Sequence, residues 1–119
     1  MALHNQLGKY GEELAADYLR DSGFRIIAMN WTFGKAEVDI IASIDRYIVF
    51  VEVKTRSGTE FGLPEDFVSP SKQKRLQWAA EGYIYQHDYR GEVRFDIVSV
   101  LFDERGKYRI NHIEDAFWG

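Results

Sequence analysis

The chain has 119 residues with 45% hydrophobic and 15% aromatic content, which predicts one folded domain over residues 1–119 and excludes a disordered tail. It contains no cysteine, so disulfides and thiolate metal sites are excluded and a reducing, cytoplasmic location is expected. The net charge of −4 argues against a basic, nonspecific nucleic-acid coat, and we expect neither a membrane span nor a signal peptide.

A first helix is predicted over residues 7–21, because apolar residues recur there at the helical spacing. Glu12 lies at the border of the apolar face of this helix, whereas Glu13 points toward solvent. Gly23 is expected to end the helix, as a glycine at this position commonly does. A strand over residues 24–29 follows.

Two β-branched runs come next, residues 36–42 and 48–54, and the short turn between them predicts an antiparallel hairpin. A register in which Ser43 faces Ile48 predicts two charged cross-strand pairs, Asp39–Glu52 and Glu37–Lys54. The same register places charged residues on one face and apolar residues on the other: Glu37, Asp39, Glu52 and Lys54 against Val38, Ile40, Val51 and Val53.

Carboxylates on a buried strand are destabilising unless they are paired or bind a metal ion. Three carboxylates beside one lysine leave an excess of negative charge, which either raises their pKa values or recruits a divalent cation. Oxygen ligands favour Mg²⁺ or Mn²⁺ over zinc. The alternative interpretation is a buried salt bridge from Lys54 to Glu37 or Glu52, which explains one carboxylate and leaves the others unpaired.

A long connection over residues 56–68 contains two glycines and a proline, and we expect it to be mobile or to face a ligand. A second helix is predicted from Ser69 to about Gln86, with the serine as N-cap. Lys72 and Gln73 fall on the buried side of its first turn, where a helix N-terminus favours a phosphate. An ordinary capping turn with surface side chains is the alternative for these two residues.

Strands over residues 94–102 and 108–113 complete the chain, so the element order predicts an α/β (α+β) fold with a mixed sheet and helices packed on it. Arg94 and Asp96 alternate on one face of the fourth strand, and we interpret them as a structural pair. The three histidines lack the spacing of metal ligands.

Several short motifs occur together along this chain. They are Gly11-Glu12 with Leu14-Ala15, Asn30-Trp31, Glu37-Val38-Asp39, the run from Phe50 to Arg56, Phe61-Gly62, Lys72-Gln73-Lys74 and Arg94-Phe95-Asp96. On these residues the chain resembles the YraN-like UPF0102 family, a branch of the PD-(D/E)XK, restriction-endonuclease-like superfamily similar to Holliday junction resolvases. Ala36 stands where the family usually has glycine.

The resemblance implies a restriction-endonuclease-like αβββαβ core and a metal-dependent endonuclease that hydrolyses DNA phosphodiester bonds, including those of branched or distorted DNA. In that function Asp39 and Glu52 would bind Mg²⁺ or Mn²⁺ together with the Val53 carbonyl. Lys54 would orient a water molecule or stabilise charge on the phosphate oxygens.

The remaining candidate site residues carry two interpretations each. Glu12 matches the helix-borne acid of the superfamily, which assists the metal directly or through water, although a border glutamate is normally only solvated. Glu37 belongs either to the metal shell or to a pair with Lys54.

Nucleic acid, DNA in particular, is the expected partner, and the similarity to junction resolvases suggests a homodimer. The candidate phosphate contacts are Arg56, Lys74 and Arg75, although exposed basic residues usually serve solubility. Trp31, Phe33, Phe61 and Trp78 could stack on bases where exposed, with core packing as the alternative. Two rival functions stay open: a catalytically inactive nucleic-acid-binding module, and a protein-interaction partner in DNA repair or ribosome-associated machinery.

Overall fold

The computed structural model of the chain describes residues 2–58 and 68–117. Most of the connection predicted over residues 56–68, including Phe61 and Gly62, lies outside the described residues. The helices and strands, in chain order, are α1 (Ala2–Asp21), β1 (Arg25–Phe33), β2 (Ala36–Ile44), β3 (Tyr47–Ser57), α2 (Pro70–His87), β4 (Glu92–Phe102) and β5 (Tyr108–Ile113).

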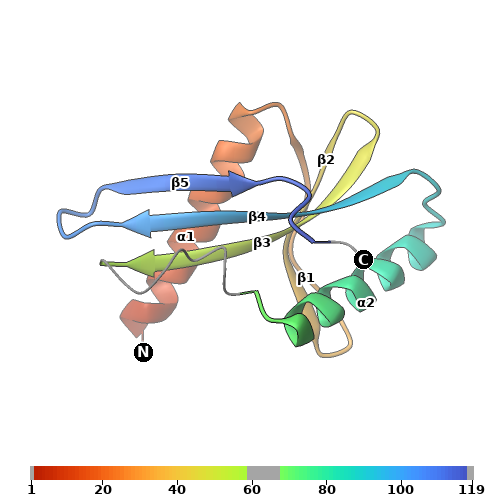
Figure 1. Cartoon of the computed structure of the whole chain (residues 1–119), viewed down its shortest axis with the longest axis horizontal. Helices are drawn as coiled ribbons and strands as arrows, with labels where there is room; N and C mark the ends of the chain where they lie inside the picture. Colours follow the sequence, from red (N-terminus) through yellow and green to blue (C-terminus); the bar gives the residue numbers. More distant parts are fainter. Residues whose placement is uncertain (1, 59–67, 118–119) are drawn as a thin grey trace.

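These strands form one five-stranded sheet in the order β1-β2-β3-β4-β5. Strands β1 to β3 and the pair β4–β5 are antiparallel, whereas β3 and β4 run parallel and are connected through α2 (Figure 1). The sheet is therefore mixed, and the predicted α/β class with a restriction-endonuclease-like αβββαβ core is confirmed. Within the described ranges, no helix has the length and apolar content needed to cross a membrane.

Local sequence signals place most element ends close to the predicted positions. Ser69 caps α2 by accepting a hydrogen bond from the Lys72 backbone amide at 3.2 Å, and Pro70 occupies the first helical position. Several predicted bounds were too short, with the largest differences at α1, which begins at Ala2, and at β1, which continues to Phe33.

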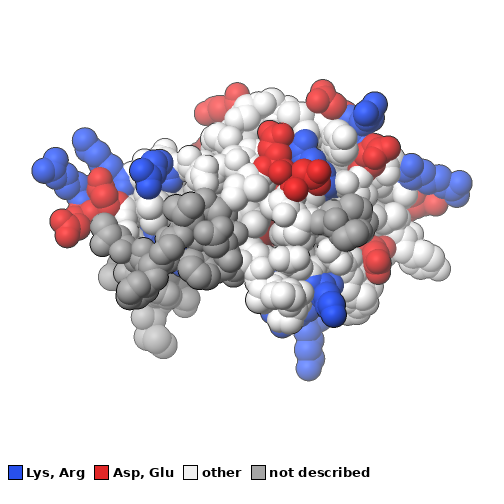
Figure 2. Space-filling model, viewed as in Figure 1, with Lys and Arg blue, Asp and Glu red and all other residues white. Residues whose placement is uncertain are grey.

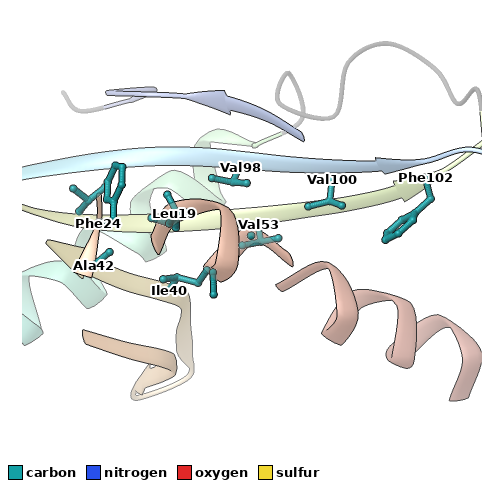
Figure 3. Packing of buried hydrophobic residues seen from close by; sticks show 12 residues of the cluster. Leu19, Phe24, Ile40, Ala42, Val53, Val98, Val100 and Phe102 are labelled. Carbon is teal, nitrogen blue, oxygen red and sulfur yellow. The ribbon is translucent and has the colours of Figure 1, made fainter. Parts of the chain in front are cut away.

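One helix covers each face of the sheet, and each helix has its own apolar cluster. Ala15, Ala16 and Leu19 of α1 pack on side chains from β2, β3 and β4, several of which Figure 3 shows. Helix α2 packs its buried residues on the opposite face. The buried members of this second cluster from the helix and the sheet are Ala36, Val38, Ile41, Ile48, Phe50, Leu76, Ala79, Ala80, Tyr83 and Phe95.

The predicted register between β2 and β3 is confirmed at Ser43–Ile48 and ends at the pair Ile40–Val51. The pairs predicted beyond that point, Asp39–Glu52 and Glu37–Lys54, do not form. The prediction that Val38 and Ile40 share one face was also wrong, because Val38 packs in the α2 cluster and Ile40 in the α1 cluster.

The difference coincides with a backbone irregularity on the neighbouring strand. Asn30 interrupts β1 with a positive φ of 51°, between the pairs Met29–Ile40 and Trp31–Val38. Asparagine is among the few residues that adopt this conformation readily. Both pairs share one register, so Asn30 stands opposite Asp39. The side chains of β2 change face at that position, and Asp39 lies beyond the last pair of the β3 ladder.

Helix α1 approaches β3 closely at Gly11, so we expect Gly11→Ala to destabilise the protein by about 1–3 kcal/mol. A methyl group at this position would overlap Thr55 Oγ1 on β3. The clash should outweigh the roughly 1 kcal/mol by which alanine is the better helix former. Urea unfolding of both proteins measures the difference.

Gly8 provides the matched control, because a methyl group there meets no heavy atom within 4 Å. We expect Gly8→Ala to stabilise the protein by about 0.5–1 kcal/mol. Equal effects of the two substitutions would show that the close approach at Gly11 has no energetic consequence.

Candidate metal and nuclease site

Four elements bring charged side chains together where β2 and β3 separate. Asp39 comes from β2, Glu52 from β3, Glu12 from α1 and Lys72 from α2. Beyond the last ladder pair, Asp39 Oδ2 accepts a hydrogen bond from the Val53 backbone amide at 2.8 Å. The Asp39 side chain thus takes the place of a backbone carbonyl as the acceptor for this β3 amide, which holds the carboxylate against β3.

Glu52 is the most deeply buried carboxylate of this group, with 4% of its surface exposed. Its Oε2 atom lies 3.3 Å from Lys72 Nζ and 3.7 Å from Lys54 Nζ. Its Oε1 atom is buried and has no hydrogen-bond partner among the described residues. The ion pair of Lys54 with Glu52, which the alternative interpretation required, is therefore present, but one carboxylate oxygen stays unsatisfied.

The pKa of Asp39 reflects the repulsion between two carboxylates in one poorly solvated place. Burial, and after it the charge of Glu52, raise the pKa of Asp39 to about 8 against the opposing hydrogen bond from the Val53 amide. Glu12 adds to the increase and Lys72 opposes it. Near neutral pH Asp39 accordingly holds a proton that a cation could replace.

Glu12 lies beside this centre on α1, partly buried as its border position predicted. Its Oε1 atom accepts a hydrogen bond from Asn30 Nδ2 at 3.0 Å. A pocket of about 230 Å³ opens next to it and is lined by Leu7, Gly8, Glu12, Val53, Thr55 and Arg56. Three residues predicted for the site (Glu12, Val53 and Arg56) therefore share one opening.

Other predicted site residues are not brought to the carboxylates. Glu37 is exposed on β2, opposite Thr32 of β1. Gln73 donates its side-chain amide to the Val68 carbonyl at 3.0 Å, as expected for a capping turn. Lys74 and Arg75 are exposed on α2.

Arg56 donates to the Thr55 carbonyl at 2.8 Å. Across the described ranges, no three Asp, Glu or His side chains form a ready-made metal cage. Any cation here would therefore draw on main-chain oxygen and water in addition to Asp39 and Glu52.

Residues 11–100 match the sequence model of Uncharacterised protein family UPF0102. The chain belongs to the UPF0102 family. A UPF0102 protein of Flavobacterium psychrophilum is 49% identical to it over 99% of this chain and 98% of its own length. UPF0102 proteins of Bacteroides fragilis and Syntrophomonas wolfei are 46% and 45% identical, over 99% and 97% of this chain and 97% and 100% of their own lengths.

The UPF0102 match covers the whole charged centre, from Glu12 to Lys72, and the resemblance inferred from the short motifs is confirmed. Sequence reasoning gave no role to the side chain of Asn30, although the motif Asn30-Trp31 contributed to the resemblance. An asparagine inside a strand is unusual enough to suggest a backbone irregularity at that point.

A second buried network in this UPF0102 protein lies on β4 and β5. Asp96 is fully buried and accepts two hydrogen bonds of 2.9 Å from Arg94, which confirms the structural pair. His112 Nε2 lies 2.7 Å from Asp96 Oδ2, which also accepts one of the Arg94 hydrogen bonds, and His112 Nδ1 lies 3.0 Å from the Tyr18 hydroxyl. The histidine is thus a partner of the carboxylate, a role that its position in the sequence did not suggest.

The pKa of Asp96 moves in the opposite direction from that of Asp39. Burial alone would raise the pKa of Asp96, but hydrogen bonds from His112, Arg94 and the Asp115 backbone amide outweigh burial and hold it below its ordinary value. Asp96 therefore stays ionised and paired, whereas the Asp39 carboxylate has too little positive charge nearby to stay ionised at neutral pH.

Proposed function

We propose that this UPF0102 protein is a divalent-metal-dependent endonuclease that hydrolyses phosphodiester bonds of branched or distorted DNA. The observation that carries the proposal is that two neighbouring carboxylates lack full compensation of their charge and hydrogen-bonding capacity. Glu52 has a buried oxygen without a partner, and burial beside Glu52 raises the pKa of Asp39 to about 8. In structural ion pairs, buried carboxylate oxygens normally have hydrogen-bond or charge partners. In metal sites without their metal, carboxylate oxygens can lack such partners because the cation is their partner.

The donor set fits Mg²⁺ or Mn²⁺. The Asp39 and Glu52 carboxylates and the Val53 main-chain carbonyl would hold the cation, with Glu12 assisting directly or through water. All of these donors are oxygen atoms, which suit hard cations that retain several water ligands. When bound, the cation neutralises charge on the scissile phosphate and lowers the pKa of a water molecule.

The lysines and arginines around the carboxylates have separate tasks in this proposal. Lys54, next to Glu52, orients the attacking water or stabilises the charge that develops on the phosphate oxygens. Arg56, at the pocket beside Val53, and the exposed Lys74 and Arg75 bind phosphates along the DNA strand.

Metal affinity should depend on pH through Asp39. The apparent affinity for Mn²⁺ is expected to rise about tenfold per pH unit between pH 6 and pH 8 and to level off above pH 8, because binding must displace the Asp39 proton. Calorimetric titration with Mn²⁺ at pH 6, 7, 8 and 9 measures this dependence. Asp39→Asn serves as the control and should show no such slope, and a flat profile in the wild type would contradict the prediction.

Lys72 competes with the cation for Glu52 in this proposal. Because Lys72 Nζ lies 3.3 Å from Glu52 Oε2, Lys72→Met should raise Mn²⁺ affinity about fivefold, equivalent to about 1 kcal/mol. Lys74→Met is the matched control two residues along the helix, where the side chain is exposed, and it should leave the affinity unchanged. An unchanged or lower affinity in Lys72→Met would show that Lys72 does not compete.

The direct test incubates the purified protein with duplex, single-stranded, flapped and four-way DNA in Mg²⁺ or Mn²⁺, beside Lys54→Met. We expect cleavage that requires the metal and falls about 10²- to 10³-fold in the variant, with DNA binding retained. If no DNA is cut and the wild type binds DNA as Asp39→Asn does, the proposal fails in favour of an inactive binding module.

A further inference from the structure

The outward face of α2 combines basic residues with an exposed tryptophan. Lys74, Arg75 and Trp78 are all exposed, and helical spacing places Trp78 between the other two around the helix axis. Trp78 has 49% of its surface exposed, although large aromatic side chains are usually buried well beyond that. One apolar ring therefore lies on the surface within a basic helix face.

The ring of Trp78 is supported from below by the hairpin that joins β1 and β2. The Phe33 ring meets it edge-on, with centroids 4.7 Å apart. Gly34, with a φ of 59°, brings the turn so close that a Cβ atom there would lie 2.8 Å from the Trp78 ring. The indole is thus held firmly along one side while the rest of it is open to solvent.

The charge of this surface favours a polyanion. Lys72, Lys74 and Arg75 lie on this part of α2 and Lys35 on the hairpin, against two exposed acids at its borders, Glu37 and Glu81, so basic residues outnumber acidic ones. Figure 2 shows Lys and Arg side chains projecting from the lower edge of this face, where Figure 1 places the start of α2 and the tip of the hairpin. In a chain with a net charge of −4, such a segment stands out.

The surface lies close to the proposed metal site. Lys72, in the first turn of α2, contacts Glu52. Trp78 follows six residues later, which corresponds to about 9 Å along the helix axis. The same spacing turns Trp78 about 120° away from Lys72 around the axis, so the ring lies on a different side of the helix from the carboxylates. A base stacked on Trp78 would therefore belong to a nucleotide several positions from the scissile phosphate.

We infer that Trp78 stacks on an unpaired base several nucleotides from the cleavage point, so the substrate is DNA with a single-stranded segment, such as a flap or a fork, and not continuous duplex. Bases inside a duplex are already stacked and cannot present a face to a protein side chain, whereas unpaired bases stack on exposed aromatic rings with little sequence preference. Lys74 and Arg75 bind the phosphates on either side. This inference rests on the proposed function, because it names the substrate class of the same site.

The test compares the affinity of the wild type, Trp78→Leu and Trp78→Phe for a labelled oligo-dT strand and for a duplex of equal length, by fluorescence anisotropy in Ca²⁺. Trp78→Leu should weaken single-strand binding about 5- to 150-fold and leave duplex binding unchanged, and Trp78→Phe should retain most of the single-strand affinity. Lys74→Gln and Arg75→Gln should instead weaken both interactions and reduce their salt dependence.

A second measurement on the wild type avoids any effect of the substitutions on folding. Photo-crosslinking to a strand that carries bromouracil, followed by peptide mass spectrometry, should identify the peptide that contains Trp78. Equal losses for single strand and duplex in Trp78→Leu, or crosslinks only elsewhere, would overturn the inference.

The two proposals fail separately. If Mg²⁺ supports no cleavage but Trp78→Leu specifically loses single-strand binding, the nuclease is wrong and the stacking site stands. If DNA is cut but Trp78→Leu binds single strands as the wild type does, the nuclease stands and the stacking site is wrong.

Discussion

Replacing Asp39 by asparagine is expected to reduce metal-dependent DNA cleavage by at least about 10³-fold. The amide cannot supply the negative charge that would hold the cation beside Glu52, and several kcal/mol of transition-state stabilisation depend on that cation. The fold should be retained, because the asparagine oxygen can still accept the hydrogen bond that the Val53 amide donates to Asp39. Cleavage rates with saturating Mg²⁺ measure the loss, and an active variant would remove Asp39 from the site.

The same substitution should change how stability depends on pH in the absence of metal. The pKa of Asp39 is about 8 in the folded protein and 3.8 without its surroundings. Between those values the native state holds a proton that the unfolded chain has released, so stability falls as pH rises toward 8. Asp39→Asn lacks this term, and its stability relative to the wild type should increase from pH 5 to pH 8.5. Urea unfolding with a chelator at both pH values tests this, and parallel slopes would contradict it.

Replacing Asp96 by alanine is expected to lower the free energy of unfolding by about 3–5 kcal/mol, a large part of the 5–15 kcal/mol typical of a whole domain. The reason is not only the lost hydrogen bonds. The Arg94 guanidinium, with 14% of its side chain exposed, would keep only the exposed Glu114 at 3.8 Å as a counter-charge, and His112 would lose its acceptor. Urea unfolding at neutral pH measures the effect.

Two controls separate this burial effect from the general loss of an ion pair. Asp17→Ala removes the exposed pair with Arg20 on α1 and should change stability by less than about 1 kcal/mol. The double variant Arg94→Met, Asp96→Leu removes both buried charges and should be less destabilised than Asp96→Ala alone. If Asp96→Ala costs no more than Asp17→Ala, the buried network does not stabilise the fold.

Most of the fold could be predicted from the sequence because local patterns determine it. Ser69-Pro70 mark the start of α2, and β5 occupies the predicted residues 108–113. The register of β2 on β3 also followed from the short turn between them. These signals are all confined to a few neighbouring residues, which is the range over which sequence reasoning works well.

The parts of the site that escaped prediction depend on contacts between distant segments. The predicted alternation of β2 fails where Asp39 faces the left-handed residue Asn30 of β1, and nothing within β2 itself marks that position. The contact of Asn30 with Glu12 requires α1 to lie against β1, and the partnership of His112 with Asp96 requires the register of β5 on β4. Neither arrangement can be read from spacing within one segment.

The irregularity of β1 also bears on edge-to-edge pairing with other molecules. This strand forms one border of the sheet, where unpaired main-chain groups and the exposed side chains of Ile27 and Met29 could recruit a strand from another molecule. Its register on β2 shifts between Ile26 and Ala28, and Asn30 has a left-handed φ, so the border is not a flat, regular strand. Bulges and irregular residues of this kind hinder pairing with a strand of another molecule, so we expect the distortion beside the charged centre to disfavour association through this border.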